Sequence, residues 1–389
     1  MNFKRVKIKD VLFFQEGPGV RNTQYTLDGV KLLNVANLVD GRIDLSTSNR
    51  YISEQEAYGK YKHFLCDAGD FIVASSGIKV DYIDKKMGFV TEDMLPLCMN
   101  TSTIRFKSLD DEILDIRYFM YYLKSKDFKE QLSRYITGSA QLNYGPSHLR
   151  KMTMPIANIV DQKRISHVLD KLSNIILLKK RTLIYLNDLV SGRFVEMFGD
   201  MVLNPNGWEK TLLGEACDVR DGTHDSPKYF AEGYPLVTSK NVTGGKIDFT
   251  DCSLICEEDY KKINQRSKVD LGDILMPMIG TVGNPVIVDV DVEFAIKNMA
   301  LIKFRKQSTV INSFVKALLE SDYFDMAVIS KIRGGTQKFI SLGDIRKLKI
   351  CLPPINIQEQ FADFVRSVDK SKFQEEIQLK TTELTAKKC

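Results

Sequence analysis

The sequence has few of the features that mark secreted, membrane-embedded or metal-binding proteins. Its 389 residues contain seven cysteines, an odd number without a repeating framework, and the nearest pair, Cys252 and Cys256, has a CxxxC spacing with no second pair to match it. We therefore expect free thiols in a reducing compartment rather than disulfides or a zinc site. No run of eighteen apolar residues is present, and MNFKRVKIKD at the start contains no apolar signal segment, so a cytoplasmic protein is expected.

Sequence signatures of common enzymes are missing as well. There is no GxxxxGK[ST] phosphate loop, no FxGxG-like cofactor loop, no HExxH and no GxSxG, and LPPI at 352–355 lacks the residues of the [ND]PP[FY] motif of amino-methyltransferases. The four histidines have no carboxylate or cysteine at ligand spacing: His63, His148, His167 and His224. We therefore predict no catalytic residue and no metal site in this chain.

Net charge and composition do not identify the kind of molecule that this chain binds. The net charge of +5 is small for this length, so it permits an anionic partner without requiring one. A hydrophobic fraction of 43% and a charged fraction of 27% are typical of a folded globular protein. The chain is too long for one average domain, and two or more hydrophobic cores are expected.

What the sequence does contain is an internal repeat. GSAQLNYGPSHLRKMTMPI at 138–156 matches GGTQKFISLGDIRKLKICLPPI at 334–355 at an offset of 196 residues, and after a two-residue insertion we align Asp161-Gln162 with Glu359-Gln360. Farther back, Tyr25, Gly29, Asn37, Gly41, Ile43 and Asp44 recur at an offset of 204, and Gly69-Asp70 recurs as Gly272-Asp273. A period this long indicates a duplicated domain rather than a solenoid.

Each copy is predicted to be a compact α+β domain. Short apolar or alternating runs, separated by Gly, Asn and Asp, indicate strands, and one amphipathic helix is expected near 115–136 and again near 311–332. We place the two similar domains at 1–157 and 201–355.

A long helix is predicted after each domain, at 158–200 and at 356–389. The first has a heptad seam interrupted by Lys179 and formed by Ile165, Leu169, Leu172, Ile176, Leu183, Leu186 and Val190. The second has a weaker seam, formed by Phe361, Val365, Val368 and Leu379. We expect the two helices to pair as a coiled coil, and the alternative is that each packs on its own domain. Forty helical residues extend about 60 Å, somewhat under two turns of B-DNA.

Polar loops at matching places are the candidate binding sites. Loops 17–26 and 221–230 precede the same framework yet share little sequence, and they supply Arg21, Asn22, Gln24, Tyr25, Thr223, His224, Asp225 and Lys228. Such side chains read base edges in DNA, although a solvated polar turn is the simpler alternative for any one of them.

Glycine-bordered loops form a second candidate set, because glycine allows backbone N–H groups to approach a phosphate. These loops and their neighbours supply Ser75, Ser76, Lys79, Gln141, Asn143, Tyr144, Lys240, Thr281, Thr336, Gln337 and Lys338. Arg150-Lys151 and Arg346-Lys347 either hold phosphates or form a solvated strand edge.

Together these segments resemble the specificity (S) subunit of type I restriction–modification enzymes. The resemblance rests on DGTHDSPKYFAEGYPLVTSKNV, the GDI at 272, the GGTQ…IRKLKICLPPINIQEQ exit, the GPGVRN…NVANL stretch of the first copy and a long helix after each copy. It implies a DNA-binding host-defence protein of the prokaryotic cytoplasm, in which each target-recognition domain reads one half of a split DNA sequence and an antiparallel coiled coil sets the spacer.

The resemblance also implies partners and their cofactors. Two methyltransferase subunits and the restriction subunits would dock on this chain, and S-adenosylmethionine, ATP and Mg would bind to those subunits, with no cofactor or small-molecule substrate here. One departure is that the second helix ends at KTTELTAKKC without the LxxLxxxxFG closure of the first, so part of one docking surface is expected to be incomplete. The alternative class is a non-catalytic protein-interaction scaffold that does not read DNA.

Overall fold

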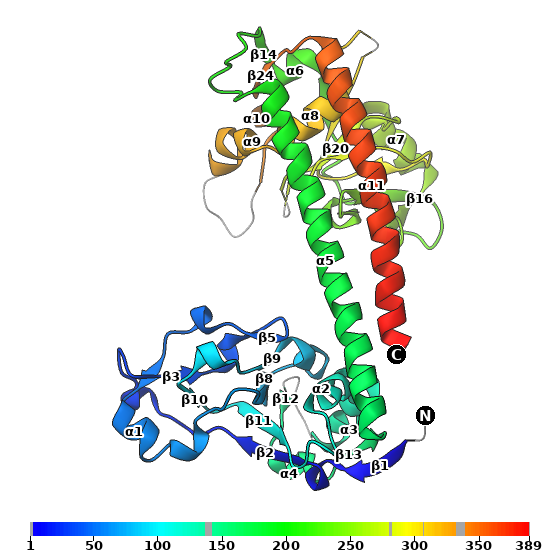
Figure 1. The fold of residues 1–389 in the computed structure, drawn as a ribbon. Coiled ribbons are helices and arrows are strands. Elements are labelled where there is room, and N and C mark those ends of the chain that lie inside the picture. Colours follow the sequence, from blue (N-terminus) through cyan, green and yellow to red (C-terminus); the bar gives the residue numbers. More distant parts are fainter. Residues whose placement is uncertain (1–2, 137–141, 280–281, 306, 332–338, 389) are drawn as a thin grey trace. The chain divides into compact units, whose positions relative to one another are not determined.

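The computed structural model describes residues 3–136, 142–279, 282–305, 307–331 and 339–388, and it divides into two compact units (Figure 1). Unit 1 comprises Met1–Ile175 with Leu384–Cys389, and unit 2 comprises Ile176–Glu383.

Unit 1 is built on two sheets. The larger has the antiparallel order β2 (Leu12–Glu16), β11 (Thr103–Ser108), β7 (Phe71–Ala74), β9 (Met87–Phe89), and the smaller has the order β10 (Leu97–Met99), β3 (Val30–Leu33), β6 (Tyr51–Ile52). Helices α2 (Ile116–Lys124) and α3 (Lys126–Tyr135) bury Phe119 and Phe128 against Phe71 and Phe106 of the larger sheet. The remaining elements are β1 (Lys4–Lys7), β4 (Leu38–Val39), β5 (Arg42–Ile43), α1 (Glu54–Tyr58), β8 (Ser76–Ile78), β12 (Leu142–Asn143), α4 (Pro146–Leu149) and β13 (Thr153–Ile156).

Unit 2 repeats this topology. Its larger sheet has the order β15 (Asp218–Asp221), β23 (Met299–Lys303), β20 (Ile274–Pro277), β21 (Val286–Ile287), and its smaller sheet has the order β19 (Ser253–Ile255), β16 (Tyr234–Val237), β22 (Ala295–Ile296). Strand β14 (Lys210–Leu212) pairs with β24 (Lys349–Cys351) as β1 pairs with β13. The other elements are α6 (Leu213–Ala216), β17 (Val242–Thr243), β18 (Lys246–Ile247), α7 (Glu257–Ser267), α8 (Asn312–Leu319), α9 (Asp322–Ala327) and α10 (Leu342–Arg346). The predicted α+β class and duplication are confirmed.

The repeated Gly-Asp pair closes a turn in both units. The Asp70 carboxylate accepts from the Asp67 backbone at 2.9 Å, and the Asp273 carboxylate accepts from the Asp270 backbone at 2.8 Å. In unit 2 the side chain of Lys303 forms ion pairs with Asp270 and Asp273. Its hydrogen bond to Asp270 holds the pKa of that carboxyl group below the usual range. Burial raises the pKa of Asp273. The aspartates of these turns and Lys303 therefore have a structural role.

We expect Lys303→Met to destabilise unit 2 by about 3 kcal/mol, because it leaves the buried Asp273 carboxylate without its cation. The matched control is Lys268→Met, since the Lys268 side chain is 69% exposed and 3.5 Å from Asp270. That control should change stability by no more than about 0.5 kcal/mol. Urea unfolding of the two variants measures the difference, and equal losses would contradict the assignment.

The prediction of a single helix near 115–136 and near 311–332 is wrong. The first region forms α2 and α3, and the second forms α8 and α9. The Ser125 side chain accepts from the Phe128 backbone at 3.2 Å and begins α3 one residue after α2 ends. Ser321 also directly precedes a helix, α9, but its hydroxyl donates to the Leu318 carbonyl at 2.6 Å instead of capping that helix. Both serines have an extended backbone, which separates the two helices of each region.

The two-residue insertion in the sequence alignment is also wrong. Gln162 donates to the carbonyls of Ile113 and Ala157 and accepts from the Asp115 backbone. The residue that makes the corresponding three bonds in unit 2 is Gln358, not Gln360. The offset of 196 therefore continues unbroken into the long helices, which begin at Ile159 and Ile355.

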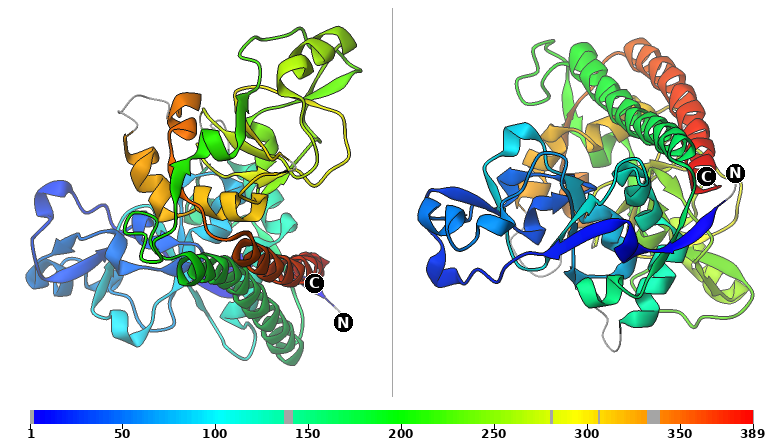
Figure 2. Two further views of the ribbon diagram at one scale, coloured as in Figure 1. Left: turned by 90° about the horizontal axis from the view of Figure 1, so that it is seen from above. Right: turned by 60° about the horizontal axis from the view of Figure 1, so that its bottom comes forward.

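The long helices α5 (Ile159–Phe198) and α11 (Ile355–Lys388) lie side by side in both sets of views (Figures 1 and 2). Between 171 and 190 the positions of α5 that are not fully exposed are those of the predicted seam, together with Lys179. The final turns of α5 enter the core of unit 2, where Phe194 and Phe198 pack on Phe361 of α11. The predicted pairing of the two helices is confirmed.

Candidate nucleic-acid interface

Three segments of unit 1 that are distant in sequence meet at one place, which we call the unit 1 junction: loop 17–26, strand β8 with β12, and turn 100–103. The Asn100 side chain accepts from the Val20 backbone at 3.3 Å and donates to the Tyr25 hydroxyl at 3.4 Å. The Ser76 hydroxyl donates to the Ser102 hydroxyl at 2.7 Å. Turn 100–103 therefore connects the two sets of loops that the sequence singled out separately.

The unit 2 junction is formed by the corresponding segments: loop 221–230, residues 278–279 with 339–340, and turn 296–299. A ring nitrogen of His224 is 2.9 Å from the Asn298 side-chain oxygen, and Lys297 donates to the Ser226 hydroxyl at 2.6 Å. The Met278 backbone donates to the Asn298 carbonyl at 3.3 Å, as the Ser75 backbone donates to the Ser102 carbonyl at 2.8 Å. The same backbone arrangement thus carries different polar side chains.

A glycine is required at the base of both junctions. Gly17 donates to the Thr103 carbonyl at 2.9 Å, and Gly222 donates to the Met299 carbonyl at 3.0 Å. An added Cβ would lie 2.0 Å from the Asn100 oxygen in unit 1 and 2.3 Å from the Ile296 oxygen in unit 2. Because no side chain fits there, the base of each junction is held while the loop beyond it varies.

The central turn was not predicted from the sequence. Ser102 has a φ of +66° and Asn298 a φ of +55°, a left-handed conformation that few non-glycine residues adopt. Such strain persists where the surrounding structure enforces it, and it is concentrated at functional sites. The signal that could have found this turn is the alignment at offset 196, which places the polar MNTST at 99–103 on AIKNM at 295–299, next to a buried strand in each unit.

The predicted residues of unit 1 fall into exposed and internal groups. Arg21, Asn22, Lys79 and Asn143 are exposed, while Tyr25 and Ser76 are half-buried. The Gln24 amide is used inside the unit, because it donates to the Glu56 carboxylate at 2.6 Å and to the Tyr61 hydroxyl at 3.0 Å.

Two predicted contacts of unit 1 belong to the core. Ser75 and Tyr144 are each 1% exposed, and the Tyr144 backbone donates to the Ser75 carbonyl at 2.9 Å. The fully buried Ile340, whose backbone donates to the Met278 carbonyl, is the counterpart of Tyr144 in unit 2. We therefore correct these two positions from DNA contacts to core positions, because both side chains are buried within unit 1.

The predicted residues of unit 2 lie mainly on loop 221–230. His224, Asp225 and Lys228 are exposed, Thr223 is half-buried, and Lys240 is exposed on a short 3-10 turn, Ser239–Asn241. Of the basic pairs, Arg346 donates twice to the Val219 carbonyl and so acts within the fold. The remaining predictions lie outside the described residues: Gln141, Thr281, Thr336, Gln337 and Lys338.

The imidazole of His224 is held from two sides. Its other ring nitrogen is 3.0 Å from the carboxylate of Asp221, whose side chain is 10% exposed and also forms an ion pair with Arg266. With Asn298 on the opposite nitrogen, the ring plane is set by the fold rather than by solvent. An aromatic edge and the ammonium of Lys297 are thereby presented together on the surface of unit 2.

A basic hollow adjoins the unit 1 junction. It has a volume of about 250 Å³ and is lined by Ile78 and Lys79 of the β8 segment together with Val39, Asp40, Tyr82, Lys85 and Lys86, so three lysines outnumber one carboxylate there. Three ammonium groups around one depression form a suitable site for a phosphate. Lys85 and Lys86 were not singled out from the sequence, although the run Asp84-Lys85-Lys86 beside a glycine loop was a usable signal.

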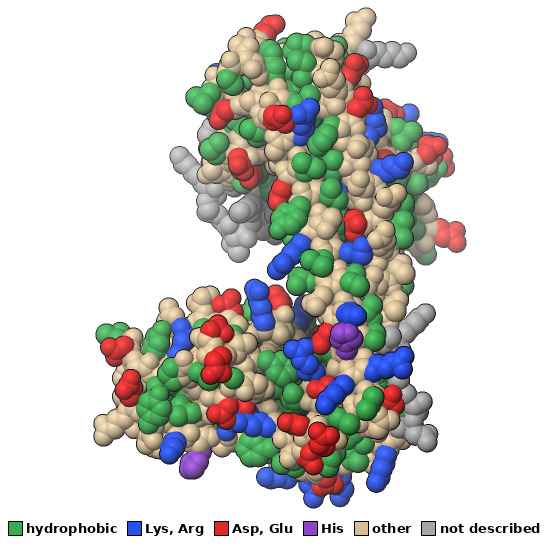
Figure 3. Space-filling view, in the orientation of Figure 1, with side chains coloured by type: hydrophobic (Ala, Val, Ile, Leu, Met, Phe, Trp, Pro, Cys, Tyr) green, Lys and Arg blue, Asp and Glu red, His purple; other side chains and the backbone are tan. Residues whose placement is uncertain are grey.

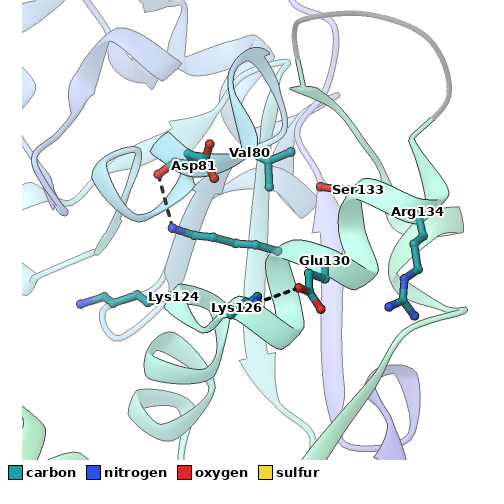
Figure 4. A pocket seen from close by; sticks show the side chains of 8 residues that line it. Val80, Asp81, Lys124, Lys126, Glu130, Ser133 and Arg134 are labelled. Carbon is teal, nitrogen blue, oxygen red and sulfur yellow. Dashed lines mark hydrogen bonds and ion pairs between the residues drawn. The ribbon is translucent and has the colours of Figure 1, made fainter. Parts of the chain in front are cut away.

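A second basic hollow, of about 600 Å³, lies between α3 and the chain at Val80 and Asp81 (Figure 4). Lys126 pairs with Glu130 at 3.5 Å there, and Lys129 donates to the Asp81 carbonyl at 3.3 Å. At offset 196 the lysines at 124, 126 and 129 correspond to Glu320, Asp322 and Asp325 in unit 2. Because the charge reverses between the copies, this hollow is not part of the repeated junction.

No helix in the described part of the chain is long and apolar enough to cross a membrane. Among the same residues, no three His, Cys, Asp or Glu side chains gather as a metal site.

Two α+β units of one design, each with a polar junction of its own, and a pair of long helices make up the protein. The sequence model of the type I restriction modification DNA specificity domain matches residues 2–187 and again residues 205–382. The chain therefore belongs to this family of DNA specificity subunits of type I restriction–modification systems, and it is itself non-catalytic.

Individual relatives are distant. The MjaVIII specificity subunit of Methanocaldococcus jannaschii is 26% identical over 278 residues, which cover 67% of this chain and 64% of that protein. The EcoKI specificity subunit of Escherichia coli K12 is 22% identical over 275 residues, which cover 65% of this chain and 58% of that protein. The chain thus spans less than two thirds of either relative. The crystal structure of a type I restriction–modification S subunit from M. genitalium shares the fold, with a TM-score of 0.58 at 16% identity over 99% of this chain and 94% of that one.

Proposed function

We propose that each unit reads one half of a bipartite double-stranded DNA target. The observation that carries this proposal is the junction built twice on the same backbone hydrogen bonds with different side chains: Ser76 and Ser102 in one unit, His224, Lys297 and Asn298 in the other. A constant frame with variable polar tips is what a pair of modules needs in order to read two different half-sites. Lys79, Lys85 and Lys86 would hold the DNA backbone beside the first half-site.

The two long helices would set the gap between the half-sites. The 40 residues of α5 extend about 60 Å, and both its ends are fixed, through Gln162 in unit 1 and through Phe198 in unit 2. In this proposal the continuous helix would act as a spacer of defined length and not as a flexible linker.

The outer face of α5 would dock a methyltransferase subunit. Ile175, Leu178, Tyr185 and Leu189 follow one another at helical spacing and are 40% to 67% exposed, and Figure 3 shows hydrophobic side chains exposed along this helix. An apolar stripe of this kind on a helix whose other face is already paired indicates a protein partner. In this proposal two methyltransferase subunits and the restriction subunits carry S-adenosylmethionine, ATP and Mg, and the complex works in the prokaryotic cytoplasm.

The experiment that tests the proposal is a selection from random double-stranded DNA with the full chain. The expected product is a sequence of two fixed parts with a constant gap, bound with an affinity that falls steeply as salt is added, because phosphate contacts release counterions. A protein-interaction scaffold would select no sequence and would show little salt dependence. That outcome would replace the proposal.

A further inference from the structure

The basic interruption of the α5 seam has a specific partner. Lys179 forms an ion pair with Glu375 of α11 at 3.0 Å and donates to the Gln378 side chain at 2.6 Å. The side chains of Lys179 and Glu375 are only 18% and 27% exposed, whereas the next ion pair between the two helices, Lys180 with Glu383, is 56% and 38% exposed. The seam therefore contains one well-shielded charge pair.

This pair joins equivalent positions of the internal repeat. The offset of 196 that relates Gln162 to Gln358 also relates Ile165 to Phe361, and it relates Lys179 to Glu375. In two antiparallel helices related by a two-fold axis, equivalent residues contact each other only at the axis itself. The Lys179–Glu375 contact therefore marks the axis of the repeat within the coiled coil.

At this position the two copies of the repeat have side chains of opposite charge, whereas most other positions of the seam have apolar side chains in both copies. Leucine and valine layers alone tolerate a shift by one heptad, but such a shift would place Lys179 opposite Val368 or Thr382 and leave a half-buried ammonium unpaired. Pairing of like helices from two chains would place lysine against lysine or glutamate against glutamate. Both alternatives cost free energy that the observed pairing does not.

We propose that the Lys179–Glu375 pair determines both the choice of helix partner within one chain and the register of the coiled coil, and thereby the length of the DNA gap. The pair is thus a specificity determinant for the spacing of the half-sites rather than for their bases. The link to DNA rests on the proposed function, while the choice of partner and register does not.

Charge reversal at the axis tests this proposal in the full chain. Lys179→Glu and Glu375→Lys each create a like-charge contact, and the double variant K179E/E375K restores an opposite pair. Each single variant should lower the thermal unfolding midpoint by about 3 °C. Each single variant should also bind about tenfold more weakly to DNA that has the preferred gap between its half-sites. It should bind DNA targets with a wider range of gaps than the natural chain does. The double variant should return both measurements close to those of the natural chain.

The matched control is Lys180→Glu, which reverses a charge one residue away in the exposed pair with Glu383. Its effect on both measurements should be small, because exposed ion pairs contribute little. Single variants that behave like this control, or a double variant that fails to recover, would overturn the proposal. If the natural chain selects no bipartite site, the proposed function fails, and the unfolding midpoints still decide whether the pair fixes the helices.

Discussion

Removing one heptad from each long helix should shorten the preferred gap by about three base pairs and leave both half-sites unchanged. The suitable segments are 180–186 of α5 and 368–374 of α11, which lie opposite each other, because their removal keeps the flanking seam positions in phase and leaves Lys179 facing Glu375. Seven residues shorten a helix by about 10 Å, which corresponds to about three base pairs of B-DNA. Selection from random DNA reads the gap and the half-sites in one measurement.

A deletion of four residues from each helix, 180–183 and 371–374, is the control for helix phase. It retains the same charge pair but turns the seam positions after the cut away from the partner helix. We expect this variant to lose the defined gap altogether and to unfold at a lower temperature. An unchanged gap after the seven-residue deletion would exclude the spacer function of the helices.

Substitutions at one junction should impair only one half of the target. His224→Ala combined with Lys297→Ala removes the two groups held on the surface of unit 2, and a loss of about 100-fold in binding is expected, with the base preference relaxed in one half-site alone. Arg21→Ala combined with Asn22→Ala should act on the other half-site. Binding to DNA targets with each half changed in turn measures the effect.

Controls for this prediction lie on the same units outside the junctions. Lys126→Ala and Arg134→Ala alter the basic hollow whose charge is reversed in the second copy, so they should leave the base preference of both half-sites intact. A substitution at the unit 2 junction that weakened both half-sites equally would show that the junction supports the fold or general DNA affinity instead of reading bases.

Much of the fold followed from the repeat, because framework residues such as Asn37 and Asn241 hold the same turn in both copies. The Asn37 amide donates to the Asp44 carbonyl at 3.1 Å, and the Asn241 amide donates to the Asp248 carbonyl at 3.3 Å. The alignment failed at the start of the long helices, where residue identity favoured Gln360 and only the hydrogen bonds of Gln358 reveal the true counterpart.

The candidate site was less predictable for physical reasons. Turns 100–103 and 296–299 share a backbone conformation but no residue at matching positions, so only their common offset of 196, and no shared motif, relates Ser102 to Asn298. Tyr144 follows a polar stretch and was expected at the surface, yet its side chain is buried in the hydrophobic core of unit 1. Loops that differ between copies reveal a binding surface only when the frame around them is known.

Because α5 is anchored at both ends, the bases that such a protein recognises and the distance between its half-sites would change in different ways during evolution. Because the helix starts on Gln162 in one unit and ends on Phe194 and Phe198 in the other, insertions within it are tolerated only in whole heptads that preserve the seam. The loops of the junctions can meanwhile change residue by residue on a fixed frame. A lineage of such chains would therefore alter the bases of its target gradually and the distance between them in discrete steps.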